Sequence, residues 1–260
     1  TRKGVKWNNY NEPVIPAWVA DMDFPVAPEI QEVLLERVQS SDLGYPIAFE
    51  KSNLPDLLTE RLQERFSWEI NPSEVLSLTD VVQGLYYAVK LFSCKKDGVI
   101  IQTPIYPPFL QCVRELDRKV IINPLRQASK KYEIDFEHLE HCLKGNPKIL
   151  MLCNPHNPTG RVYSREELEK LATFACRNDL IILSDEIHSD LVLDPVPHIP
   201  IASISKEVEA RTITFLSASK SFNIAGLCLA FVHISDRNLF KIFDELPRHL
   251  IGSHNSLSLA

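Results

Sequence analysis

Three short polar stretches place amide, carboxylate and amine groups directly after apolar runs of the chain. Their sequences are NPHNPTG (154–160), SDEIH (184–188) and SASKSFN (217–223). The first contains two Asn-Pro pairs and a closing glycine, which specify a tightly determined loop. The second places Asp185 at the end of a predicted buried strand, where a carboxylate is costly unless it is paired. The third contains Lys220, and a lysine amine can condense with an aldehyde. Together these groups predict amine–carbonyl chemistry assisted by a carboxylate.

Two further loops contribute a candidate phosphate site and an aromatic ring. The N–H groups of Val81 and Val82 lie at the start of a predicted helix, where an anion such as phosphate is favoured. Tyr106 lies in a proline-rich turn that presents its ring. Taken singly, each feature has an ordinary explanation: Tyr106 could pack, Asp185 could cap the next segment, and Lys220 could be a solvated charge.

The elements that must position these groups follow from the hydrophobic pattern. Seven short apolar, β-branched runs are typical of strands buried on both faces, and they span residues 74–79, 99–102, 120–123, 149–153, 180–184, 212–216 and 229–234. Amphipathic helix candidates span residues 28–39, 54–65, 82–92, 108–116, 136–143, 165–178 and 236–246. Ser164 and Glu167 form a capping box before one of these helices, and Ser235 is expected to open the last.

Alternating strands and helices predict an α/β fold, a three-layer sandwich with a mostly parallel seven-stranded sheet between two layers of helices. In such sheets ligands bind beyond the carboxyl ends of the strands, so the five loops should converge on one crevice. They supply a helix N-terminus, an aromatic ring, an amide, a carboxylate and an amine. That set of groups is what pyridoxal phosphate requires.

The three polar stretches resemble the motifs of fold-type I pyridoxal-phosphate enzymes in the class I/II aminotransferase superfamily. The likeness is strongest to the cystathionine β-lyases of the MalY/PatB type, because ADMDF (20–24), GYP (44–46) and His188 are similar to markers of that branch. The motifs come in the family's order and cover nearly the whole chain. The resemblance implies the aminotransferase large domain, with the small domain largely missing because family members continue well beyond the position of Ala260.

The resemblance also implies a role for each polar group around the cofactor ring. Lys220 would form the Schiff base with the cofactor and later move the α-proton of the substrate. Asp185 would pair with the pyridine nitrogen, and His188 would support it as a second contact or an orienting group. Asn157 would bond to the phenolic oxygen, and Tyr106 would stack on the ring.

The resemblance implies that the phosphate is bound by the N–H groups of Val81 and Val82 and by the hydroxyls of Ser217 and Ser219. Tyr45 would reach the phosphate of the neighbouring subunit in a homodimer.

Two positions depart from the family's pattern. Cys228 occupies a position where many members carry an arginine that helps to anchor the phosphate, although the β-lyase branch often lacks it. Asp80 stands where the phosphate loop normally has a small neutral residue. A carboxylate close to a phosphate dianion is unfavourable, so the direction in which Asp80 points determines its effect on cofactor binding.

The preferred function is a pyridoxal-phosphate-dependent C–S β-lyase that acts on an amino acid and yields a thiol, pyruvate and ammonia. An aminotransferase uses the same residues, and a non-catalytic cofactor-binding or regulatory protein is the alternative from another class. A metal site at Asp185, Glu186 and His188 has little support, because no further ligand has suitable spacing. His198 is expected to lie in a surface loop, beyond two prolines.

Composition limits the remaining choices. The net charge of −6 argues against a nucleic-acid partner, and no apolar run reaches the ~18 residues of a membrane span. Six scattered cysteines without a CxxC pair indicate reduced thiols, hence a cytoplasmic location. We expect an N-terminal arm and first helix at 1–45, a cofactor-binding large domain at 46–245, and the start of a further segment at 246–260.

Overall fold

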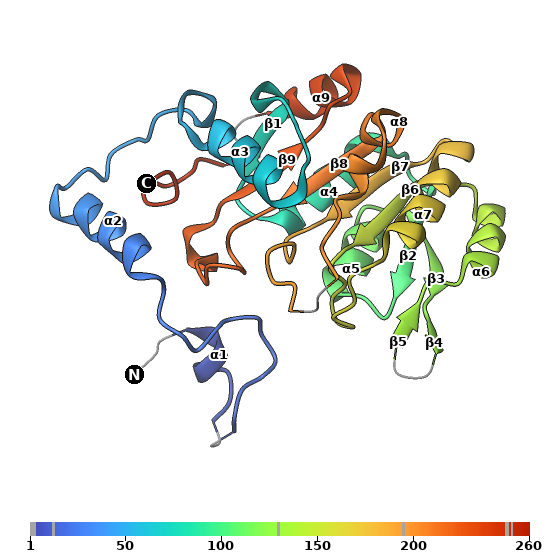
Figure 1. Ribbon diagram of the computed structural model, residues 1–260, viewed down its shortest axis with the longest axis horizontal. Helices are drawn as coiled ribbons and strands as arrows, with labels where there is room; N and C mark the ends of the chain where they lie inside the picture. Colours follow the sequence, from blue (N-terminus) through green and yellow to red (C-terminus); the bar gives the residue numbers. More distant parts are fainter. Residues whose placement is uncertain (1–3, 12–13, 129–130, 194–195, 248–249, 251) are drawn as a thin grey trace.

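A seven-stranded sheet forms the middle layer of the protein (Figure 1). The computed structural model describes residues 4–11, 14–128, 131–193, 196–247, 250 and 252–260. The strands are β1 (Val75–Leu78), β2 (Gly98–Thr103), β3 (Lys119–Pro124), β6 (Pro147–Cys153), β7 (Ile181–Asp185), β8 (Thr212–Leu216) and β9 (Ala230–His233). Each corresponds to one of the seven predicted runs, which confirms the α/β fold class.

The order of the strands is β1-β9-β8-β7-β6-β2-β3. The pairs from β3 to β8 are all parallel, whereas β9 runs antiparallel to both of its neighbours. Because β1 is antiparallel to β9, it points in the same direction as β8. The loops after β1, β2, β6, β7 and β8 therefore leave the same edge of the sheet, as expected for a mostly parallel sheet with one reversed strand.

Helices cover both faces of the sheet. The main ones are α3 (Leu54–Phe66), α4 (Val81–Phe92), α5 (Pro107–Glu115), α6 (Phe136–His141), α7 (Arg165–Arg177) and α9 (Arg237–Asp244). Successive residues of β2 show the alternation: Val99 and Ile101 pack in the cluster that includes α4, α5 and α9, whereas Ile100 packs in the cluster that includes α7. No helix in the described part of the chain is long and apolar enough to cross a lipid bilayer.

Local signals place the ends of the predicted helices to within two residues, although the predicted cap of one helix is wrong. The capping box of Ser164 and Glu167 is formed at the start of α7. The prediction that Ser235 opens α9 was wrong: the cap is Asp236, whose Oδ1 accepts the N–H groups of the first turn at 2.9 Å. A small hairpin of β4 (Arg126–Ala128) and β5 (Lys131–Glu133) was not predicted, because three-residue strands carry too little pattern.

The N-terminal residues extend away from the sheet (Figure 1). They contain α1 (Val5–Asn8) and α2 (Pro28–Gln39), and α2 buries none of its residues. By contrast, α3 packs against the sheet through a third apolar cluster that contains Leu58, Leu62 and Trp68. The division of the chain at residues 45 and 245 stays a prediction.

Close packing of α4 on the sheet requires the glycine at position 84. A Cβ atom there would lie 2.6 Å from Cε1 of Phe215 and 2.7 Å from Cδ1 of Leu78. Alanine is normally about 1 kcal/mol better than glycine inside a helix. Here we expect Gly84→Ala to lower the free energy of unfolding by about 1–3 kcal/mol, because overpacking outweighs the gain in helix propensity.

Urea denaturation of the full chain measures this effect. Gly226→Ala is the matched control, because nothing lies within 4 Å of the added methyl group, and it should change the unfolding free energy by less than about 0.5 kcal/mol. Equal stability of the two variants would contradict the packing argument.

Candidate active site

Hydrogen bonds between main-chain atoms tie together the loops at the carboxyl ends of the strands. The N–H of Tyr106, at the start of α5, donates to the carbonyl of Asn157 in the NPHNPTG loop over 3.2 Å. The N–H of Asn154 donates to the carbonyl of Asp185 at the end of β7 over 3.0 Å. The structure therefore brings three of the predicted loops into one continuous site.

Asp185 is buried at the centre of this site, with 6% of its surface exposed. Its Oδ1 accepts the N–H of Ile187 over 3.0 Å, so it also caps the next segment. Burial raises the pKa of Asp185 to about 7, with a further rise from Glu186, against the opposing effects of the Ile187 N–H and the Lys220 ammonium. A buried carboxylate in this condition is suited to a cationic or N–H partner.

Lys220 lies in the turn after β8, where it is half-buried. Its positive charge acts on both Asp185 and His188. The pKa of His188 is lowered, first by burial and then by the Lys220 charge, which favours a neutral imidazole. The amine, the carboxylate and the imidazole thus share one electrostatic environment, as expected from the three polar stretches.

The Ser217 hydroxyl is committed to the turn that carries Lys220. It donates to the carbonyl of Leu229 over 2.7 Å and accepts the N–H of Ser219 over 3.1 Å. The Ser219 hydroxyl makes no hydrogen bond within the described part of the chain. Phosphate binding by these two hydroxyls stays a prediction, and Ser219 is the one with a free hydroxyl.

The start of α4 offers the N–H groups of Val81 and Val82, which have no acceptor among the described residues. Asp80 occupies the N-cap: its Oδ1 accepts the N–H of Gln83 over 2.8 Å. The carboxylate is therefore turned onto the end of its own helix. An anion bound by the two free N–H groups would lie near this negative charge.

Tyr106 and Asn157 present polar groups to solvent at the same site. The Tyr106 side chain is 42% exposed, so it is not simply packing. The main-chain N–H of Asn157 donates to Sγ of Cys153 over 3.4 Å, while its side-chain amide has no partner within the described residues. Both side chains are available to a ligand.

The prediction that His198 lies in a surface loop was wrong. Its Nε2 is 2.8 Å from Oε2 of Glu186, and both side chains are fully buried. The other oxygen of Glu186 accepts the hydroxyl of Ser184 over 2.8 Å. A carboxylate next to Asp185 cannot be buried unpaired, and His198 provides the partner from twelve residues away. The described residues contain no group of three side chains able to hold a metal ion.

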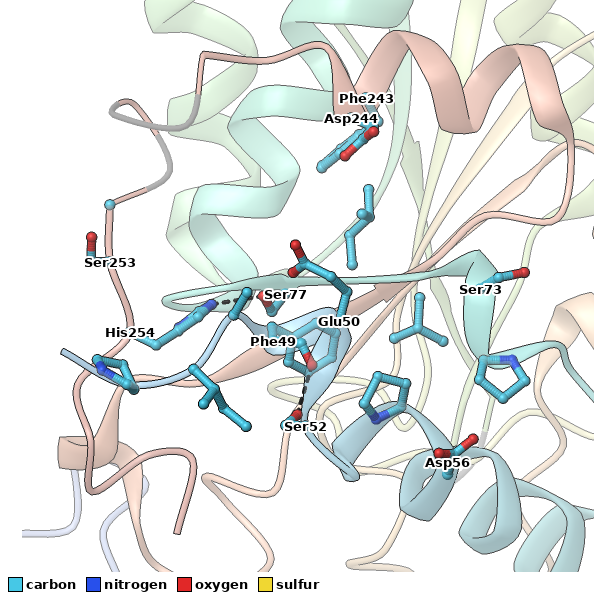
Figure 2. A pocket seen from close by; sticks show the side chains of 18 of the residues that line it. Phe49, Glu50, Ser52, Asp56, Ser73, Ser77, Phe243, Asp244, Ser253 and His254 are labelled. Atoms are coloured by element: carbon cyan, nitrogen blue, oxygen red, sulfur yellow. Dashed lines mark hydrogen bonds between the residues drawn. The ribbon is translucent and has the colours of Figure 1, made fainter. Parts of the chain in front are cut away.

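Tyr45 lies apart from these loops. It lines a cavity of about 800 Å³ at the β1 edge of the sheet, together with Phe49, Phe243 and His254, which Figure 2 shows. Its side chain is fully exposed and makes no hydrogen bond or ring contact with the described residues. Within one chain, the structure does not bring Tyr45 to Lys220, and its role toward a second subunit stays a prediction.

Two asparagines in the site were not selected from the sequence. Asn154 is buried, its Oδ1 accepts the N–H of Tyr163 over 3.1 Å, and its Nδ2 has no partner within the described residues. Asn223 binds the main chain of residues 22–24. Both lie inside the polar stretches, but only the tertiary contacts distinguish them from ordinary turn residues.

These groups fit pyridoxal phosphate. The second oxygen of Asp185 has no hydrogen-bond partner in the described chain and could accept a protonated ring nitrogen. The free N–H groups at the start of α4 suit a phosphate. The amide of Asn157 suits a phenolic oxygen, and Lys220 supplies the amine for the aldehyde.

Comparison with known proteins agrees with this fit. A sequence model of the family described as Aminotransferase class I and II matches residues 27–260. Cystathionine beta-lyase PatB of Bacillus subtilis (strain 168) is 37% identical over 264 residues, covering 99% of this chain and 68% of that protein.

Two solved structures share the architecture. The crystal structure of OvoB superposes with a TM-score of 0.95 at 39% identity, covering 99% of this chain and 68% of that one. The pyridoxal-phosphate-bound C–S lyase from Staphylococcus hominis gives a TM-score of 0.90 at 32% identity, covering 99% and 66%. The chain therefore spans about two thirds of the length of these relatives.

Proposed function

Because this chain belongs to the class I and II aminotransferase family, we propose that it is a pyridoxal-phosphate-dependent carbon–sulfur β-lyase. The observation that carries the proposal is the buried carboxyl of Asp185. It lacks a cationic hydrogen-bond partner within the described residues, and the charge of Lys220 lowers its pKa against the effect of burial. The lyase names of the relatives favour this reaction over transamination. The substrate would be an amino acid with sulfur on its β-carbon, and the products a thiol, pyruvate and ammonia.

When bound, the cofactor supplies an aldehyde that takes an amine and a ring that accepts electrons. The Asp185 carboxylate would hold a proton on the ring nitrogen, and the neutral His188 imidazole behind it would orient that carboxylate. The Asn157 amide would bond to the phenolic oxygen, and the Tyr106 ring would cover one face. The N–H groups of Val81 and Val82 would bind the phosphate.

Lys220 has two tasks in this proposal. Its amine would attach the cofactor through the aldehyde. It would also be the general base that accepts the α-proton of the substrate, and loss of that proton is required before the bond between the β-carbon and sulfur can break.

The second candidate is an aminotransferase, because the matching family includes such enzymes and the residues named above serve both reactions. The experiment is an assay of the chain with pyridoxal phosphate and a cysteine S-conjugate, with and without an α-keto acid. Pyruvate and thiol without the keto acid support the lyase. Amino transfer that needs the keto acid supports the aminotransferase, and cofactor binding without either product supports a non-catalytic binding protein.

Replacing Asp80 with asparagine is expected to tighten cofactor binding. Asparagine caps a helix as well as aspartate does, so the bond to the Gln83 N–H should persist. Removing one negative charge near the phosphate should lower the dissociation constant of pyridoxal phosphate by about three- to ten-fold, a modest change because Asp80 is exposed. Fluorescence-quenching titrations at low and high salt measure it. Weaker binding by Asp80→Asn would contradict a repulsive role.

We further propose that the protein works as a homodimer in the cytoplasm. The arm and the following residues expose large apolar side chains, including Ile15 at 92%, Phe24 and Tyr45, which a second copy could cover. The six free cysteines suit a reducing compartment. Sedimentation of the full chain should give twice the mass of one chain, and a monomer at micromolar concentration would contradict the dimer.

A further inference from the structure

The side chain of Asn223 joins two segments that lie about two hundred residues apart in the sequence. Its Oδ1 accepts the main-chain N–H of Met22 over 3.0 Å. Its Nδ2 donates to the carbonyls of Met22 and Phe24, each over 3.2 Å. One amide therefore satisfies both main-chain groups of Met22 and a third group two residues further on.

The turn that holds Asn223 is the turn that holds Lys220. The N–H of Asn223 donates to the carbonyl of Lys220 over 3.4 Å, and the N–H of Ile224 donates to the carbonyl of Ser219 over 3.0 Å. Asn223 has a φ of 58°, in the left-handed region that asparagine tolerates better than most residues. The main chain that places the lysine thus also sets the direction of the asparagine side chain.

The same N-terminal segment is also hydrogen-bonded to α1. Lys6 is buried, and its Nζ donates to the carbonyl of Asp21 over 2.7 Å and to Oδ2 of Asp23 over 2.9 Å. Nε1 of Trp7 donates to Oδ1 of Asp23 over 3.1 Å. Residues 21–24 are therefore hydrogen-bonded both to α1 and to the turn that carries Lys220.

We propose that Asn223 is a positioning residue that holds residues 22–24 against the turn that carries Lys220 and thereby couples the N-terminal segment to that turn. The inference rests on the proposed function only in taking Lys220 as the point of cofactor attachment. Loss of the side-chain amide would increase the mobility of residues 22–24 and of the lysine turn together. It would weaken cofactor retention without unfolding the sheet, since the buried core clusters do not include Asn223.

The variant that tests this is Asn223→Gly, which deletes the amide while keeping a residue that accepts a positive φ. Asn146→Gly is the matched control. Asn146 also has a positive φ, of 51°, but it is exposed and its side chain makes no hydrogen bond within the described residues. Both variants should have similar urea midpoints.

Hydrogen exchange, followed by mass spectrometry, should show the local effect. In Asn223→Gly, peptides covering residues 20–24 and 217–222 should both exchange about ten-fold faster than in the unmodified protein, as expected from losing three hydrogen bonds. The dissociation constant of pyridoxal phosphate should rise about ten-fold. The control should change none of these.

Unchanged exchange of residues 20–24 would contradict the role of Asn223 in holding that segment. Faster exchange there with unchanged exchange of residues 217–222 would contradict the coupling between the segment and the lysine turn. The exchange data decide both points even if the unmodified chain binds no pyridoxal phosphate. Failure of the unmodified chain to bind pyridoxal phosphate would count against the proposed function alone.

Discussion

Replacing Lys220 with alanine is expected to abolish covalent attachment of pyridoxal phosphate and to lower turnover by about 10²- to 10⁴-fold. The amine would both attach the cofactor and accept the α-proton, and among the described lysines Lys220 is the one whose charge acts on Asp185. Borohydride reduction followed by digestion should place the pyridoxyl group on the peptide that contains residue 220 in the unmodified chain. The Lys220→Ala protein should carry no label.

Two controls separate the amine from the charge. Lys220→Arg keeps a positive charge near Asp185 but has no primary amine, so it should also remain unlabelled. Lys170→Ala removes an exposed lysine of α7 and should leave labelling unchanged. Label that persists in Lys220→Ala, or that appears on another lysine of the unmodified chain, would contradict the assignment.

Replacing Asp185 with asparagine is expected to lower activity and to raise stability. Asparagine cannot supply the charge that would hold a proton on the ring nitrogen, so turnover should fall by at least about 10²-fold. Without cofactor, the aspartate is a cost to the folded state at high pH. Burial raises its pKa to about 7, above the value in the unfolded chain, so the folded state favours the neutral acid.

The sign of the pH dependence follows from that shift. Below about pH 3 the carboxyl is neutral in both the folded and unfolded states, and the substitution should change stability little. Between about pH 4, where the carboxyl ionises in the unfolded chain, and about pH 7, where it ionises in the folded chain, the folded protein loses stability that the asparagine variant keeps, and the difference stays constant at higher pH. At pH 8 we expect the free energy of unfolding of cofactor-free Asp185→Asn to be about 2–4 kcal/mol higher than that of the cofactor-free unmodified chain.

Urea denaturation of the cofactor-free proteins between pH 4 and pH 8 measures this difference. Asp244→Asn, at an exposed position at the end of α9, is the matched control and should show no comparable trend. A difference that is constant with pH would mean that burial of the Asp185 charge is not its cause.

Much of the fold was predictable because its signals are local. Runs of four to six mostly apolar residues identify strands buried on both faces, and all seven are found in the sheet. The start of α7 was predicted to the residue, since Ser164 and Glu167 cap it without help from distant contacts. The hairpin β4–β5 and the cap at Asp236 were missed or misplaced, because very short elements and adjacent polar residues offer nearly equivalent local choices.

The sequence by itself determined the chemical groups of the site and the edge of the sheet at which they gather, because parallel strands place their carboxyl ends together. Only the tertiary structure decided their environments. It buried Asp185, paired Glu186 with His198, turned Asp80 onto α4 and set Asn223 against Met22. Burial, pairing and long-range hydrogen bonds depend on which segments meet in space, and residue spacing along the chain does not encode those meetings.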